Sequence, residues 1–138
     1  MALGELISLA NEIEAMPLSD KDKERLMVQA ADLVRFKEAF PEPVEIVQPF
    51  ENRGVVLSGL GYTVSVLFCE HHCRKDESLE MPGPAALPDG QQLWLVFITF
   101  SGKECCGKIA RQAASHPLRA RCDRAYVLDY STGSLNVI

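Results

Sequence analysis

The stretch LWLVFITF at residues 93–100 decides the fold class, because no other segment of the chain is apolar over such a length. Its eight residues match the length of a strand, whereas a membrane-spanning helix needs roughly 20 apolar residues. Side chains that point to both sides of this strand are apolar, which is typical of a central strand covered on both faces. The sequence therefore predicts a sheet with residues 93–100 at its centre and a packing layer on each side.

Helical periodicity precedes this region. A first helix ends at Pro17, and its expected buried stripe consists of Leu3, Leu6, Ile7, Ala10 and Ile13. Ser19 is the expected N-cap of a second helix, which stops at Pro41. The buried stripe of this second helix should contain Leu26, Ala30, Leu33, Phe36 and Phe40.

Strand-like alternation begins after Pro43. Short strands are expected at residues 44–47, 54–58 and 62–69, with Gly59 and Gly61 allowing a tight turn between the last two. A long insertion with three prolines follows at about residues 70–91. After the central strand, a third helix should run from about residue 101 to 115, and a hairpin should form from residues 125–129 and 134–138.

These elements predict a single α+β domain over residues 1–138. It should have two N-terminal helices, a mostly antiparallel sheet of about five to six strands, and one helix before a C-terminal β-hairpin. If residues 62–69 pair antiparallel with the central strand, Cys69 lies near Leu93 and far from Cys105. A strand at the end of the chain also leaves an edge on which another chain can pair.

The net charge of −5 is unevenly distributed. Residues 1–51 carry eleven acidic and five basic side chains, whereas residues 101–125 carry six basic and two acidic ones. Such asymmetry favours an electrostatically directed contact with another molecule, although two solvated faces would give the same pattern. The candidate partner-binding residues are those of the basic segment: Lys103, Lys108, Arg119, Arg121 and Arg124.

Five cysteines stand at positions 69, 73, 105, 106 and 122. The N-terminus has no cationic stretch before its apolar residues, so we expect no secretion signal, a cytoplasmic location and no disulfide framework. Cys69, His71, His72 and Cys73 together offer two thiols and two imidazoles, the donors that zinc prefers. Their spacing differs from that of structural zinc sites, which draw two pairs of ligands from separate segments. Zinc is therefore an alternative, beside thiol chemistry at the same residues.

Residues 102–108 match the pattern G-x-x-x-x-G-K at the start of the third expected helix. Ile109 stands where a phosphate-binding loop has the Ser or Thr that holds Mg²⁺, which counts against nucleotide hydrolysis. Anion binding at this helix start remains open, as does nucleic-acid binding by residues 103–124. Nucleic-acid binding is disfavoured because half of the chain is acidic. The basic segment also has no aromatic residue between Lys103 and Tyr126 on which a base could stack.

The sequence thus favours a non-enzymatic binding module: an adaptor, regulator or inhibitor that contacts a protein partner. This hypothesis depends on the two-sided apolar strand, the terminal strand edge, the long insertion and the charge asymmetry. A homodimer in which the acidic and basic faces meet is also open. No group of residues forms a convincing catalytic site, and we expect no contact with a membrane.

Overall fold

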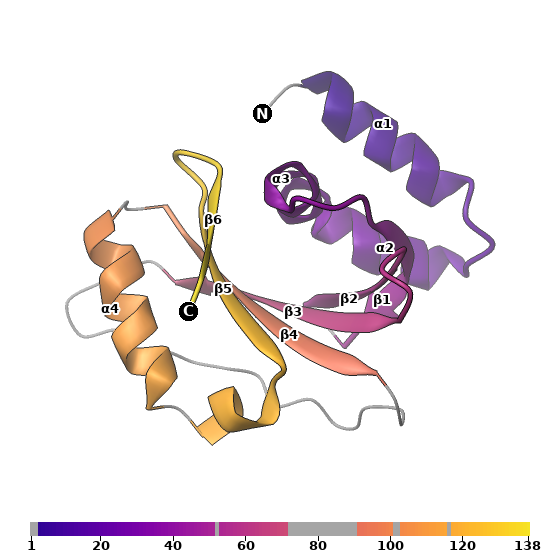
Figure 1. Cartoon of the computed structure of the whole chain (residues 1–138). Coiled ribbons are helices and arrows are strands. Elements are labelled where there is room, and N and C mark those ends of the chain that lie inside the picture. The colour runs from indigo at the N-terminus through magenta and orange to yellow at the C-terminus, as the bar shows by residue number, and fades with distance from the viewer. Residues whose placement is uncertain (1–2, 52, 72–90, 101–102, 116) are drawn as a thin grey trace.

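The computed structural model describes residues 3–51, 53–71, 91–100, 103–115 and 117–138 (Figure 1). A six-stranded sheet forms its centre, and the strands lie side by side in chain order. They are β1 (Glu45–Phe50), β2 (Gly54–Ser58), β3 (Val64–His71), β4 (Gln92–Thr99), β5 (Arg124–Asp129) and β6 (Ser134–Val137). Three of the five neighbouring pairs are antiparallel, which confirms the predicted α+β class with a mostly antiparallel sheet.

The antiparallel pairing of β3 with β4 that the sequence left open does not occur, because β4 runs parallel to both β3 and β5. Cys69 consequently pairs with Phe97 and not with a residue near Leu93. A parallel connection requires a dozen or more residues, and the long segment between the two strands meets that requirement. The predicted insertion at about residues 70–91 lies largely outside the described residues, since β3 continues to His71 and β4 begins at Gln92.

The turn between β2 and β3 has the expected chemistry. Gly59 and Gly61 adopt φ angles of 107° and 83°, in the region that side chains with a Cβ avoid. Gly59 also lies close to the backbone before β1, because a Cβ there would stand 3.1 Å from the carbonyl oxygen of Pro43. These two glycines therefore direct the chain back along β2.

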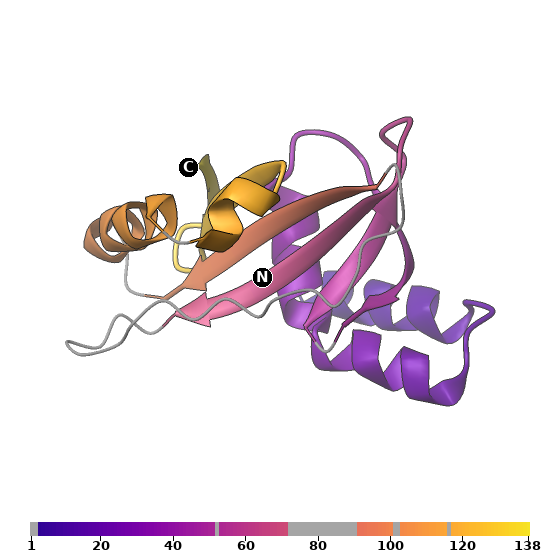
Figure 2. The same cartoon turned by 90° about the horizontal axis from the view of Figure 1, so that it is seen from below.

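Helices cover both faces of the sheet (Figures 1 and 2). One face carries α1 (Leu3–Glu14), α2 (Asp20–Val28) and α3 (Ala30–Ala39). The opposite face carries α4 (Lys103–Ala114), and the short 3₁₀ helix η1 (Pro117–Arg121) leads from it into β5. We call the first the helical-layer face and the second the α4 face. No helix in the described part of the chain has the length and apolar character needed to cross a bilayer.

The second predicted helix is in fact two helices that meet at Gln29. Ser19 caps the first of them as expected, with its Oγ accepting a hydrogen bond of 3.2 Å from the Asp22 amide. Gln29 has φ −102° and ψ 8°, outside the helical range, and its buried side chain donates to the carbonyl oxygens of Arg25 and Gly54. The bond to Gly54 ties the helix junction to β2, a long-range contact that local periodicity does not encode.

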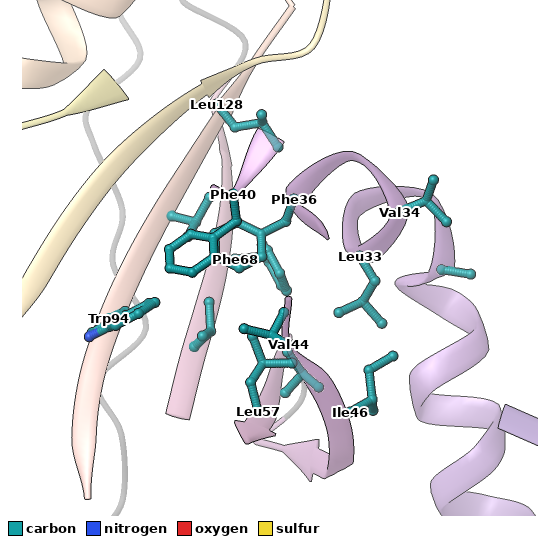
Figure 3. Close-up of a cluster of buried hydrophobic side chains, with 14 of the residues drawn as sticks. Leu33, Val34, Phe36, Phe40, Val44, Ile46, Leu57, Phe68, Trp94 and Leu128 are labelled. Carbon is teal, nitrogen blue, oxygen red and sulfur yellow. The ribbon is translucent and has the colours of Figure 1, made fainter. Parts of the chain in front are cut away.

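An aromatic cluster dominates the core beneath the helical layer (Figure 3). Phe36 of α3 and Phe40, the residue that caps the end of this helix, stack with their ring centroids 5.4 Å apart, and Phe40 lies 5.4 Å from Trp94 of β4. Phe68 meets Phe36 edge-on at 5.9 Å. Contacts of this kind add to the stabilisation from the buried area itself, so α3 is firmly held on the sheet.

The expected buried stripe of α1 is partly wrong. Leu9 and Ile13 are buried at 4% and 0% exposure, but Leu3 and Ile7 are exposed at 70% and 52%. The helix carries apolar residues on more than one side, so periodicity alone could not tell which side meets the core.

The α4 face has a smaller core, in which Phe97 is the one aromatic side chain among the described buried residues and the partly buried Phe50 packs against it. Leu95, Phe97 and Ile109 are fully buried there, together with Cys69 and Cys105. Trp94, Val96 and Ile98, on the other side of β4, are equally buried in the first core. The chain itself therefore covers both faces of its central strand, and that strand gives no reason to invoke a partner.

Candidate functional site

Three buried polar residues lie side by side at the carboxyl ends of the parallel strands. His71 of β3 pairs in register with Thr99 of β4, and Thr99 pairs with Asp129 of β5. Side chains alternate along each strand, so all three point to the α4 face, as Cys69, Phe97 and Val127 do two residues earlier. The carboxyl ends of parallel strands are the usual ligand-binding edge of an open sheet, which makes this polar row a candidate site.

Asp129 is held within the β5–β6 turn. Its Oδ1 accepts hydrogen bonds from the backbone amide and the hydroxyl of Ser131, at 3.1 and 2.7 Å. The hydroxyl bond is the main cause that lowers the pKa of Asp129 below its usual range. Asp129 is therefore charged at neutral pH, and its carboxylate stabilises the β5–β6 turn.

The cysteines near this row are poor nucleophiles. Burial raises the pKa of Cys69 to about 12. Burial first, and then the charge of Asp129, raises the pKa of Cys106. Nucleophilic attack needs the thiolate, so neither thiol is activated as a nucleophile.

The expectation that the cysteines are reduced thiols or metal ligands and not disulfide-bonded is wrong for Cys105, which is disulfide-bonded. Cys69, Cys106 and Cys122 are free thiols. No local pattern indicates this bond, because a disulfide depends on the distance between two segments in space and not on their spacing along the chain.

The candidate zinc ligands are only partly placed. Cys69 and His71 are buried on the same face of β3, whereas His72 and Cys73 lie outside the described residues. Among the residues that are described, no group of three or more His, Cys, Asp or Glu side chains is arranged to hold a metal ion. Zinc binding at these four residues stays a prediction.

The structure separates the candidate basic residues. Arg119 lies toward the α4 face, where its guanidinium donates to the carbonyl oxygen of Ile138 at 3.1 Å and to the Cys122 Sγ at 3.5 Å. Arg124 stacks over the Trp94 ring at 4.7 Å, toward the helical-layer face, and donates to the Tyr126 hydroxyl. Arg121 is exposed, Lys108 is half-buried, and the side chain of Lys103 lies outside the described residues. Arg119 and Arg124 thus do not share one surface.

A cluster that the sequence did not suggest joins α3 to the end of β3. The Arg53 guanidinium lies 3.3 Å from the Glu70 carboxylate, and both interact electrostatically with Asp32. Burial, and then the charge of Glu70, raises the pKa of Asp32 to about 6. These residues are far apart in the sequence, and only the placement of α3 over the sheet brings them together.

The two edges of the sheet differ in how they are protected. The β1 edge contains Pro49, a register shift between Ile46 and Gln48, and the charged Glu45. Such features discourage strand pairing with another chain. The β6 edge contains Ser134, Leu135, Asn136 and Val137, with no charge, no proline and no register shift. Val137 is 76% exposed there.

Comparison with known proteins adds no assignment. No protein-family model, no curated protein and no solved structure matches this chain.

Proposed function

We propose that the protein is a non-enzymatic binding module that acts by contact with a protein partner, and that the partner adds a strand along β6. The observation that carries this proposal is the unprotected β6 edge, in contrast to the guarded β1 edge. Strand addition to an exposed sheet edge is a common mode of peptide recognition.

The hydrogen-bond pattern of β6 supports this geometry. The amide of Ile138 donates to the carbonyl oxygen of Ala125 at 3.0 Å, so Ile138 faces β5. In an antiparallel ladder the bonding direction alternates, and therefore the backbone N–H and C=O groups of Leu135 and Val137 point away from β5. These four groups are the ones that an added strand would bind.

Two substitutions at Val137 test the proposal. Val137→Pro removes an outward N–H without taking a bond from β5, and Val137→Lys places a charge on the edge. Val47→Lys is the matched control, because Val47 is an exposed valine, at 39%, on the opposite edge strand. Each tagged form is purified from native cells after nuclease treatment, and bound proteins are quantified by mass spectrometry. Oligomeric state is measured by light scattering.

The proposal is supported if both Val137 variants lose a bound protein that Val47→Lys retains. We expect the amount of captured partner to fall at least about tenfold. Self-association that follows the same pattern identifies a second copy as the strand donor. Capture that is equal for all forms overturns the proposal, as does a monomer that captures nothing. Capture that depends on nucleic acid overturns it too and favours the basic segment 103–124.

The proposal includes a role as an adaptor, regulator or inhibitor in the cytoplasm. The free thiols of Cys69, Cys106 and Cys122 support a reducing compartment, whereas the disulfide at Cys105 counts against one. Fractionation of native cells with antibody detection decides the location, and recovery outside the cytoplasm would contradict this part.

A further inference from the structure

A groove of about 270 Å³ lies between α1 and α3, on surfaces that take no part in strand pairing. Its lining includes Glu5, Leu9 and Glu12 from α1, and Val34, Lys37 and Glu38 from α3. The spacing of these residues places each set along one side of its helix. Two neighbouring helices therefore form the walls.

The walls carry an excess of negative charge. Lys37 is the cationic side chain among the described lining residues, and its Nζ lies 3.8 Å from the Glu12 carboxylate. This ion pair spans the groove and neutralises one carboxylate. Three carboxylates and one ammonium leave a net charge of −2, carried by Glu5 and Glu38.

The floor of the groove is apolar. Leu9 and Val34 are only 4% and 5% exposed, so their side chains close the base while the carboxylates stand at the rim. Lysine and arginine have the complementary shape, because an aliphatic stem can cover apolar surface while the cationic head stays near water and counter-charges. Small-molecule pockets usually start at about 300 Å³, so this volume suits one or two inserted side chains better than a drug-sized ligand.

The wider charge distribution has the same sign. Residues 1–51 carry eleven acidic and five basic side chains, a net charge of −6, and both walls belong to this segment. A negative surface of this kind attracts cationic partners and raises their association rate.

We propose that the groove between α1 and α3 receives a lysine or arginine side chain from a basic segment of a protein partner. The argument uses the groove's shape and charge alone and does not depend on strand addition at β6. A basic side chain places its stem against Leu9 and Val34 and its cation between Glu5 and Glu38.

The test uses hexa-arginine and hexa-lysine amides as probes, titrated into the ¹⁵N-labelled protein and followed by NMR. The double variant E5Q/E38Q removes two charges from the groove. E14Q/E24Q is the matched control, because it changes the net charge equally at exposed glutamates outside the lining. Circular dichroism and thermal melting check that both variants keep the fold.

We expect saturable shifts of the Leu9 and Val34 amides, and a Kd that rises about fivefold or more in E5Q/E38Q but less than about twofold in E14Q/E24Q. Added salt should weaken binding. Equal weakening in both variants would mean diffuse charge attraction and would overturn the proposal. Absence of saturable binding by either probe at low salt would also overturn it.

Discussion

The two faces of the sheet are packed with different kinds of side chain. Beneath the helical layer, the rings of Phe36 and Phe40, at the end of α3, pack against Phe68 and Trp94. On the α4 face, mostly aliphatic residues and cysteines surround the polar row of His71, Thr99 and Asp129. The comparison predicts that the first face provides most of the packing energy, whereas the second places buried polar groups at the carboxyl ends of the parallel strands.

Removal of the central ring of the aromatic cluster is the strongest way to test this difference. Phe36 is fully buried and contacts Phe40, Phe68 and Tyr126. We expect Phe36→Ala to lower the free energy of unfolding by about 3–5 kcal/mol, because a ring-sized cavity forms among side chains that cannot collapse. Urea denaturation followed by circular dichroism measures it.

The matched change on the α4 face is Ile109→Ala, at another fully buried side chain. It should lower the free energy of unfolding by about 2–3 kcal/mol, since a smaller side chain is lost and a single helix can shift to fill the space. If Ile109→Ala proved as costly as Phe36→Ala, the two faces would contribute equally and the comparison would fail.

The faces also hold aspartates whose pKa values shift in opposite directions. Asp32, under the helical layer, has a pKa raised to about 6 from 3.8, so the folded state favours its neutral form. The contribution of Asp32 to the free energy of unfolding is fully present below pH 3.8 and is lost as the pH rises through about 6. Asp32→Asn should therefore stabilise the protein at pH 7 by about 1 kcal/mol, after allowance for partial exposure, and have little effect at pH 4.

Asp129→Asn provides the opposite control. The pKa of Asp129 is lowered by its hydrogen bonds to Ser131, so its charged form favours the folded state at neutral pH. Its replacement should destabilise the protein at pH 7, with the effect shrinking at low pH. Unfolding curves at pH 4 and pH 7 for both variants check the two signs. A loss of stability in Asp32→Asn at pH 7 would show that its carboxylate is needed for the contact with Arg53.

Local sequence signals predicted most elements of the fold but not their relations in space. Alternation in residues 44–69 and glycines at positions 59 and 61 identified the first hairpins, because both signals act between neighbours in the chain. The parallel direction of β4 was missed, although a strand that is apolar on both faces and follows a long connection is typical of parallel pairing. The division at Gln29 was missed because it depends on a bond to Gly54.

The candidate site was less predictable than the fold. Arg119 and Arg124 were assigned to one basic segment because they are near in sequence, but residues on either side of a strand entry can turn to opposite faces. The polar row of His71, Thr99 and Asp129 requires the parallel register of three strands. Asp32 and Glu70 interact only after α3 packs on the sheet. In each case the deciding contact is long-range.

The parallel pairing of β4 also determines how this chain must fold. Phe50 and Gly54 of the first hairpin are 4 residues apart, and Asp129 and Ser134 of the last are 5 apart. The β4 pairs instead join Val64 to Gln92, 28 residues apart, and Trp94 to Arg124, 30 residues apart. Because closing long loops costs entropy before contacts repay it, β4 should gain amide protection after β1–β3 in pulsed hydrogen exchange, and simultaneous protection would disprove this order. Until then LWLVFITF stays unpaired, so the segment that specifies the native sheet is also the one through which unfinished chains would aggregate.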